Sequence, residues 1–179
     1  ISSSEKGFLD NFENIVKVSK IKFNTLRGFP IVFTKKKLQS EEYKITIDKN
    51  LITIHYSDYG GKFYSIISLI QLLNYYNSNL PLGLIQDSPA LNWRGMHLDC
   101  ARQFYSIDEI KRLLDYMSFF KLNRFHWHLT DNEAWRIELE CYPNLTKVGA
   151  FRGYNEVVPP FYGTGYDKNG GCYSRAEIK

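Results

Sequence analysis

The chain has 179 residues, of which 44% are hydrophobic and 23% charged, with a formal net charge of +4; this balance is typical of a globular protein with one or two small domains and excludes disordered and collagen-like classes. The basic side chains are scattered apart from Lys35, Lys36 and Lys37, a run more typical of a solvated loop than of a nucleic-acid patch, so we expect no nucleic-acid partner. No apolar run approaches the roughly 18 to 20 residues needed to span a bilayer, so we expect no membrane segment.

Residues 1–88 are expected to form a small α+β domain. Tyr43 to Ile47 and Leu51 to Tyr56 alternate apolar with polar residues on either side of a polar turn, which predicts an antiparallel hairpin. From Phe63 to Leu73 apolar residues recur at intervals of three and four, so a helix of about four turns should pack on this sheet. The turn before Pro89 marks the expected domain boundary.

Residues 89–179 alternate strand and helix patterns. The predicted order is strand, helix, strand, long loop and helix start, at residues 94–100, 106–119, 123–130, 131–173 and 174–177. Ser and Glu three residues apart form a capping box at both helix starts. Such alternation indicates a parallel sheet or barrel with helices outside. An eight-unit barrel takes roughly 250 residues, whereas 179 − 91 = 88 residues follow position 91. We therefore expect the first units of a (β/α)8 TIM-type barrel, incomplete in this chain.

Functional sites in such folds gather at the carboxyl ends of the strands, which selects Asp99, Arg102 and the stretch from His128 to Trp135. Residues 126–135 hold two histidines, two carboxylates and two tryptophans. Asp131 falls just past the predicted strand end, where a carboxylate can orient an acid, a base or a sugar hydroxyl, or only cap the next turn. The spacing leaves both interpretations open.

Arg94 stands at the start of a predicted strand. An arginine there can donate a pair of hydrogen bonds to vicinal hydroxyls or to a carboxylate, or can form a structural ion pair.

The only adjacent Asp-Glu pair, Asp108 and Glu109, occupies the first turn of a predicted helix. Negative charge there offsets the helix dipole, so we interpret this pair as structural.

His126 and His128 would share one face of a strand, as in the zinc sites of barrel hydrolases. The only other histidine of this region, His97, falls on a separate predicted strand, so we expect ordinary interior histidines and no metal.

The three cysteines, at positions 100, 141 and 172, are widely spaced and are expected to be free, mostly buried thiols.

An ordered series of motifs resembles the opening of family 20 glycoside hydrolases, the β-N-acetylhexosaminidases. The motifs are Arg94 to Asp99, Lys121 to Asn123, His126 to Asp131, Trp135 to Glu138, Tyr142 to Thr146, and Gly149 with Ala150. Residues 42–45 and the helix from Phe63 to Leu73 are similar to the small domain that precedes the family's barrel. The resemblance covers the chain from about residue 42 to its end.

This resemblance implies removal of terminal β-linked N-acetylglucosamine or N-acetylgalactosamine from glycoconjugates or chitooligosaccharides. The configuration is retained, and the substrate's acetamido oxygen is the nucleophile. Arg94 resembles the arginine that grips hydroxyls of the terminal sugar, and Asp131 the aspartate that supports the acid/base glutamate through a histidine. The carboxyl-end rule instead favours Asp99 and Arg102 over Arg94; we adopt the assignment that the resemblance implies.

The family's adjacent Asp-Glu pair belongs to a later strand, beyond Lys179, so this chain alone is expected to be inactive. The implied partner is a carbohydrate substrate, without a cofactor or a metal, and the family resemblance implies an exported or lysosomal location. The oligomeric state stays open. Two alternatives remain: a non-catalytic carbohydrate-binding or scaffold protein, and a metal-dependent barrel hydrolase that uses His126 and His128.

Overall fold

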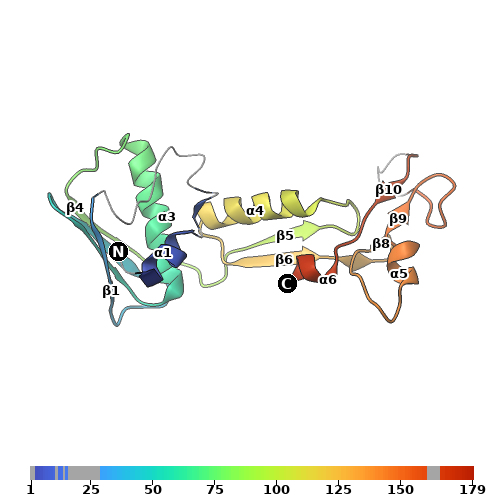
Figure 1. Cartoon of the computed structure of the whole chain (residues 1–179), viewed down its shortest axis with the longest axis horizontal. Helices are drawn as coiled ribbons and strands as arrows, with labels where there is room; N and C mark the ends of the chain where they lie inside the picture. Colours follow the sequence, from blue (N-terminus) through green and yellow to red (C-terminus); the bar gives the residue numbers. More distant parts are fainter. Residues whose placement is uncertain (1–2, 11, 14, 16–28, 161–165) are drawn as a thin grey trace. The chain divides into compact units, whose positions relative to one another are not determined.

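A computed structural model describes residues 3–10, 12–13, 15, 29–160 and 166–179 (Figure 1). The chain divides into two compact units, residues 1–93 with 118–121 and residues 94–117 with 122–179. Apart from residues 118–121, the division falls between Trp93 and Arg94. The domain boundary after residue 88 remains a prediction from the sequence. Among the helices that the structure describes, none combines the length and the apolar character required to cross a membrane.

The first unit contains a four-stranded sheet in the order β1-β3-β2-β4. Its strands are β1 (Ile31–Lys35), β2 (Tyr43–Ile47), β3 (Ile52–Tyr56) and β4 (Gly83–Asp87). Strand β1 runs parallel to β3, while β2 is antiparallel to both of its neighbours. The pairing of Ile47 with Ile52 confirms the predicted hairpin.

Helix α3 (Tyr59–Tyr75) confirms the helix predicted from the apolar spacing. It begins after Asp58, whose carboxylate accepts the Gly61 N–H at 2.9 Å and so caps the first turn. One core joins this helix to the sheet and to residues in and just after α1 (Ser3–Asp10), and its fully buried members include Phe12, Ile45, Ile54, Ile66, Ile67, Leu69 and Ile70. Burying each such apolar side chain contributes about 1.5–3 kcal/mol, which fixes the helix on the sheet.

The second unit begins with a strand-helix-strand unit, as predicted: β5 (Gly95–Asp99), α4 (Ile107–Phe119) and β6 (Arg124–His128). The two strands pair in parallel, with Gly95 opposite Arg124 and Asp99 opposite His128. Their carboxyl ends therefore lie together. Figure 1 shows α4 along one side of the two strands.

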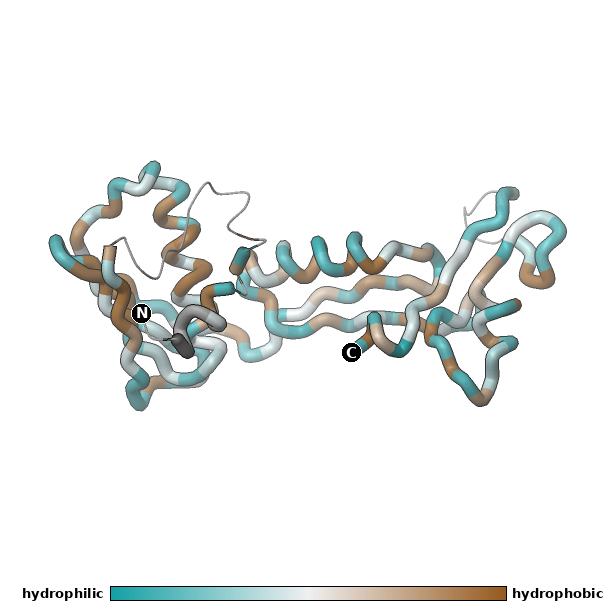
Figure 2. Tube along the Cα trace, viewed as in Figure 1, coloured by the Kyte–Doolittle hydropathy of each residue, from teal (hydrophilic) through white to brown (hydrophobic). Residues whose placement is uncertain are grey.

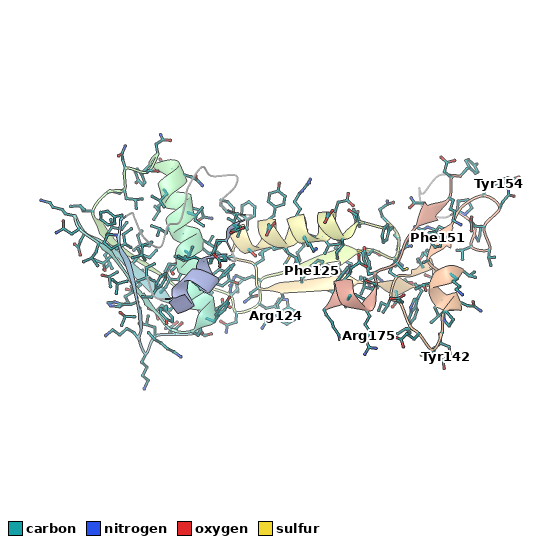
Figure 3. All side chains as sticks on the ribbon, viewed as in Figure 1. Arg124, Phe125, Tyr142, Phe151, Tyr154 and Arg175 are labelled. Atoms are coloured by element: carbon teal, nitrogen blue, oxygen red, sulfur yellow. The ribbon has the colours of Figure 1, made fainter. Side chains whose placement is uncertain are left out.

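The two faces of this strand pair differ because successive side chains alternate across a strand. Leu98, Phe125 and Trp127 pack in a core with Ile110 of α4. Figure 2 shows the apolar residues of α4 toward the strands and its polar residues away from them. Arg124 precedes Phe125 and is exposed, so the two neighbours lie on opposite faces of β6 (Figure 3). The face opposite α4 carries the histidines.

The segment predicted as a long loop contains short elements. They are β7 (Thr130–Asp131), β8 (Ala134–Trp135), α5 (Asn144–Lys147), β9 (Phe151–Arg152) and β10 (Asn169–Gly170). The pairs β7–β8 and β9–β10 are antiparallel. Helix α6 (Arg175–Ile178) follows, and the Ser174–Glu177 capping box confirms the predicted helix start.

All three cysteines are free thiols, as expected. Cys100, directly after β5, is buried, whereas Cys141 and Cys172 are exposed. The prediction of mostly buried thiols is therefore wrong for two of the three. Cys141 precedes α5 and Cys172 precedes α6, in connecting segments rather than in a packed strand, and such segments lie at the surface.

Candidate functional site

Arg102 is the centre of an ionic cluster at the carboxyl ends of β5 and β6. Its Nη1 lies 3.0 Å from Asp99 Oδ2 and 2.7 Å from Asp131 Oδ2. Its Nε lies 3.0 Å from Glu133 Oε2. These contacts use Nη1 and Nε, so that within the described part of the chain Nη2 remains available to donate to another acceptor.

Local geometry presents these side chains to one another. Asp99 ends β5, and its Oδ1 accepts the backbone N–H groups of Ala101 at 3.0 Å and Arg102 at 3.1 Å. An aspartate that bonds the backbone two residues on stabilises a tight turn. This turn directs Arg102 back across the strand ends, while the β7–β8 hairpin that follows β6 supplies Asp131 from β7 and Glu133 from its turn.

His128, the last residue of β6, also contacts Asp131. Its Nε2 lies 3.1 Å from Asp131 Oδ2, the oxygen that accepts from Arg102. About 29% of the Asp131 side chain is accessible. The carboxylate is thus oriented by two partners and still reaches solvent at the strand ends, as expected for a group that meets a ligand.

The ionisation of the cluster follows from these contacts. The pKa of Asp131 is lowered by the backbone N–H of Asn132, by His128 and by Arg102. Burial alone would raise the pKa of Asp99, but the hydrogen bonds and charge of Arg102 lower it. Partial desolvation acts to lower the pKa of Arg102, and the charges of Asp99, Asp131 and Glu133 outweigh this effect and raise it. Asp99, Asp131 and Arg102 therefore keep their opposite charges at neutral pH.

Arg136 stabilises the turn after β5 that carries Arg102. It is 1% exposed, and among the described residues its guanidinium donates to backbone carbonyls alone, those of Cys100 at 2.8 Å, Ala101 at 3.2 Å, Gly171 at 3.1 Å, and Ala150. The first two carbonyls belong to the turn after β5. One buried guanidinium therefore ties this turn to the segments around β9 and β10, which rigidifies the cluster.

Glu133 connects the cluster to a second buried arginine. Glu133 is 5% exposed and Arg152 is 1% exposed. Within the part of the chain that the structure describes, neither Nη atom of Arg152 has a hydrogen-bond partner. Burial lowers the pKa of Arg152 and the charge of Glu133 opposes this effect. Sequence reasoning included Glu133 only as one member of a dense stretch, and no local pattern pointed to Arg152.

The structure places the two expected site residues apart. Asp131 lies beyond the carboxyl end of β6, whereas Arg94 precedes the amino end of β5. There the Arg94 backbone N–H donates to Asn123 Oδ1 at 3.0 Å, and its carbonyl accepts the Asn123 N–H at 2.8 Å. The parallel register thus puts Arg94 at the opposite end from Asp131. The arginine beside Asp131 is Arg102, which the carboxyl-end rule selects.

Asp108 and Glu109 lie in the first turn of α4, as predicted. Glu109 Oε2 accepts from the Ser106 N–H at 2.7 Å and from the Ser106 hydroxyl at 2.8 Å. The first of these bonds and the Glu109 N–H donated to Ser106 Oγ at 3.4 Å form the capping box that the sequence predicts. They confirm that this Asp-Glu pair stabilises a helix start.

The strand register also brings His97 to the two histidines of β6. One potential ligand atom from each of His97, His126 and His128 lies within 4.8 Å of the others. The sequence predicts no third ligand because it puts His97 on a different strand from His126 and His128. Parallel pairing removes that reason, because it sets His97 directly opposite His126.

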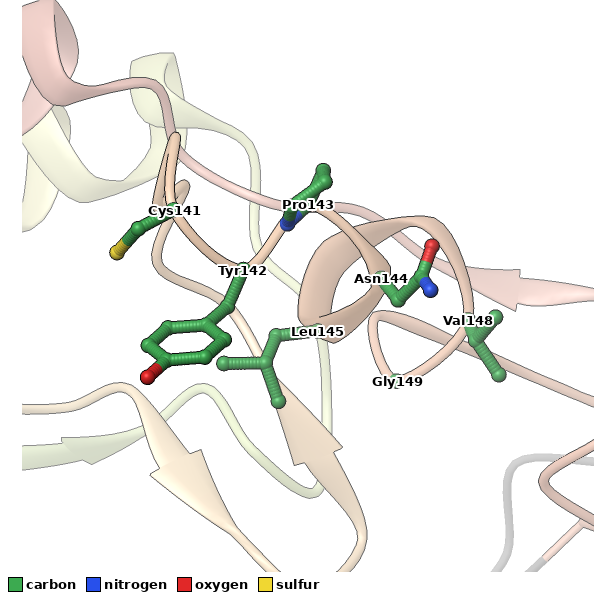
Figure 4. A pocket seen from close by; sticks show the side chains of 7 residues that line it. All are labelled: Cys141, Tyr142, Pro143, Asn144, Leu145, Val148 and Gly149. Carbon is green, nitrogen blue, oxygen red and sulfur yellow. The ribbon is translucent and has the colours of Figure 1, made fainter.

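A pocket of about 570 Å³ lies around α5 and is lined by Cys141, Tyr142, Pro143, Asn144, Leu145, Val148 and Gly149 (Figure 4). None of these residues belongs to the ionic cluster. Their side chains are mostly apolar, and no carboxylate or imidazole lines the pocket. We therefore place the candidate site at the ends of β5 and β6 and not in this pocket.

Two family models match the chain. Residues 10–88 match "Glycosyl hydrolase family 20, domain 2", and residues 91–179 match "Glycosyl hydrolase family 20, catalytic domain". Relatives include a β-hexosaminidase of Vibrio furnissii, 39% identical over 151 residues that cover 83% of this chain and 25% of that protein. An N,N'-diacetylchitobiase of Vibrio harveyi is 39% identical over 127 residues, which cover 70% of this chain and 14% of that protein.

Solved structures agree with these matches. A GH20 exo-β-N-acetylglucosaminidase of Vibrio harveyi in complex with N-acetylglucosamine superposes with a TM-score of 0.85 at 34% identity, over 98% of this chain and 28% of that one. A β-N-acetylhexosaminidase of Bacteroides fragilis gives a TM-score of 0.76 at 31% identity, over 99% of this chain and 35% of that one. The chain spans about a quarter of the length of the curated relative from V. furnissii.

Proposed function

The chain belongs to glycoside hydrolase family 20, as a domain-2 unit followed by the start of the catalytic barrel, and on this premise we propose that it contributes to a β-N-acetylhexosaminidase site. The substrate would be a glycan that ends in β-linked N-acetylglucosamine or N-acetylgalactosamine. The observation that carries the proposal is the contact between Arg102 and Asp131 at the carboxyl ends of β5 and β6, where barrel enzymes hold their substrates.

Arg102 is proposed as the sugar-binding arginine in place of Arg94. Two contacts hold its Nη1 and a third holds its Nε, so the guanidinium plane is fixed before a sugar arrives. The remaining Nη2 donor can bond a ring hydroxyl. An arginine suits this task because its planar fork can hold carboxylates on one side and donate to a ligand on the other.

Asp131 is proposed to support acid/base catalysis rather than to protonate the substrate itself. Its lowered pKa keeps it ionised at neutral pH, so it is a poor proton donor. An ionised carboxylate can instead orient a histidine and stabilise its charged form. In substrate-assisted retention the acetamido oxygen attacks the anomeric carbon, and a separate carboxylic acid protonates the leaving oxygen.

The test compares two proteins, this chain alone and a chimera. In the chimera, this chain replaces the matching segment of the V. harveyi exo-β-N-acetylglucosaminidase, a match that covers 98% of this chain. The assay is release of p-nitrophenol from its N-acetyl-β-glucosaminide. We expect turnover by the chimera and none by the folded chain alone, since the only Asp-Glu pair here caps α4.

Asp131→Asn in the chimera should lower kcat by roughly 10- to 100-fold, because loss of one oriented charged hydrogen bond has about that effect. Asp108→Asn is the matched control and should leave kcat within about twofold. A folded chimera whose kcat is unchanged by Asp131→Asn would contradict the role of Asp131. Turnover by the chain alone that Glu109→Gln abolishes would overturn the structural role of that pair.

A further inference from the structure

Three histidines gather on the face of β5 and β6 that α4 does not cover. His97 and His126 are direct partners in the parallel register, and His128 follows on the same face of β6. Their ring centroids are 4.6 Å apart for His97 and His126, 5.5 Å for His97 and His128, and 6.0 Å for His126 and His128. The trio is therefore a consequence of backbone pairing and not of one flexible loop.

The nitrogen positions are close to those of a metal site. One ligand atom from each ring lies within 4.8 Å of the others. Zinc-nitrogen bonds of about 2.0–2.1 Å in a tetrahedron place the nitrogens about 3.4 Å apart. Small rotations of the three side chains close this difference. The backbone of the paired strands need not move.

His128 lies beside a carboxylate that can support it as a metal ligand. Asp131 Oδ2 lies 3.1 Å from His128 Nε2; in the tautomer whose Nε2 proton is donated to this oxygen, Nδ1 is the ligand atom for a cation. A carboxylate that accepts the second N–H of an imidazole is the usual support of metal-binding histidines. Arg102 Nη1 lies 3.4 Å from the same Nε2, but three carboxylates balance its charge.

We propose that His97, His126 and His128 form a binding site for one divalent transition-metal cation, with Zn²⁺ as the test ion. Imidazole nitrogens suit zinc, nickel and copper, whereas Mg²⁺ and Ca²⁺ prefer oxygen ligands. This proposal differs from the prediction, made from the sequence, that these histidines bind no metal. It uses only residues of this chain and does not rest on the proposed glycosidase function.

Isothermal titration of the purified chain with Zn²⁺ tests the site directly. We expect one Zn²⁺ per chain and no binding of Mg²⁺ at the same concentration. His97→Gln or His126→Gln should weaken binding by at least about tenfold, because loss of even a supporting partner costs 10- to 100-fold. The matched control is His55→Gln, the fourth histidine, which lies on β3 in the first unit and should not change the affinity.

A second measurement needs no substitution and covers the case in which a variant fails to fold. Diethyl pyrocarbonate modifies accessible imidazoles, and mass spectrometry locates the product. Zn²⁺ should protect His97 and His126 at least about fivefold while His55 reacts at its former rate. Absence of stoichiometric binding, or equal protection of His55 and His97, would overturn the proposal. Affinity that survives the double variant His97→Gln/His126→Gln would do the same.

Discussion

At the residue scale, the site depends on one partly exposed arginine that forms ion pairs with three carboxylates. Arg102 contacts Asp99, Asp131 and Glu133 within 3.0 Å. Isolated surface ion pairs contribute little, but networks with fixed geometry contribute more. Here the network's main effect is positional, because the arginine aligns the Asp131 carboxylate at the strand ends.

Arg102→Lys in the chimera should lower kcat/KM by roughly 10- to 100-fold. A lysine ammonium cannot hold several carboxylates in one plane and also donate to a sugar hydroxyl. Arg94→Lys is the comparison, and it should change kcat/KM by less than about threefold, since its position is at the opposite end of β5. Kinetics on both variants decide between the two arginines. A larger loss for Arg94→Lys would restore the assignment implied by the family motif.

Glu133→Gln should lower the free energy of unfolding of the chain by about 2 kcal/mol. The substitution removes the negative charge that acts most strongly on the buried Arg152 guanidinium, whose Nη atoms have no hydrogen-bond partner among the described residues. The expected loss of stability is smaller than for breaking a fully buried ion pair, because Arg102, which contacts Glu133 directly, is partly exposed. Urea denaturation measures it, with the exposed Glu140→Gln as control, for which about 0.5 kcal/mol or less is expected. Equal stability of both variants would refute a buried charge role for Glu133.

At the element scale, capping decides where the helices start. Asp58 caps α3, and Ser106 with Glu109 caps α4. Helix α4 also buries Ile110 and Met117. The same Ser-Glu motif begins α6, which has four residues and no buried side chain. Identical local signals therefore stabilise helices that differ in tertiary packing.

Ser106→Ala should lower the Tm of the chain by about 2–4 °C, the effect of losing one helix cap in a protein of this size. Ser174→Ala removes the same motif from α6 and should lower Tm by less than about 1 °C, because no packed face depends on that helix. Circular dichroism melting curves of both variants give the comparison. A larger shift for Ser174→Ala would show that packing does not determine the cost of a lost cap.

At the scale of the whole molecule, each unit has its own core and its own polar anchors. The first core joins α3 to the four-stranded sheet, and the second joins α4 to β5 and β6. Several carboxyl groups in both units have lowered pKa values, and they are Asp58, Asp87, Asp99, Glu109, Asp131 and Glu177. Their hydrogen bonds and ion pairs need the ionised form.

These lowered pKa values predict acid sensitivity with a defined sign. A carboxyl whose folded-state pKa lies below its unfolded value stabilises the fold above the unfolded pKa, and this stability is lost as the pH falls through the folded pKa. We expect similar Tm values at pH 7 and pH 5.5 and a clear decrease below about pH 4. Melting curves across this range test it. A Tm at pH 3 equal to that at pH 7 would contradict the prediction.

The sequence by itself determined the elements whose causes are local. Two-residue alternation predicts the β2–β3 hairpin, three- and four-residue spacing predicts α3, and the Ser-Glu pairs predict the starts of α4 and α6. The strand before Asp131 is also predicted from the local sequence, whereas the short strand β7, which contains Asp131 itself, is not. Ordered motifs were sufficient to identify the family because they sample many positions along the chain.

Only the tertiary structure decided which of these residues meet. The pairing of Arg102 with Asp131, 29 positions apart, and the clustering of His97 with His126 both require the parallel register of β5 and β6. That register is set by a crossover through α4 and by packing against its buried face, over distances that no short periodicity encodes. A slip of one residue would move His126 to the face that packs on α4. The site therefore depends on long-range pairing, while its parts depend on local sequence.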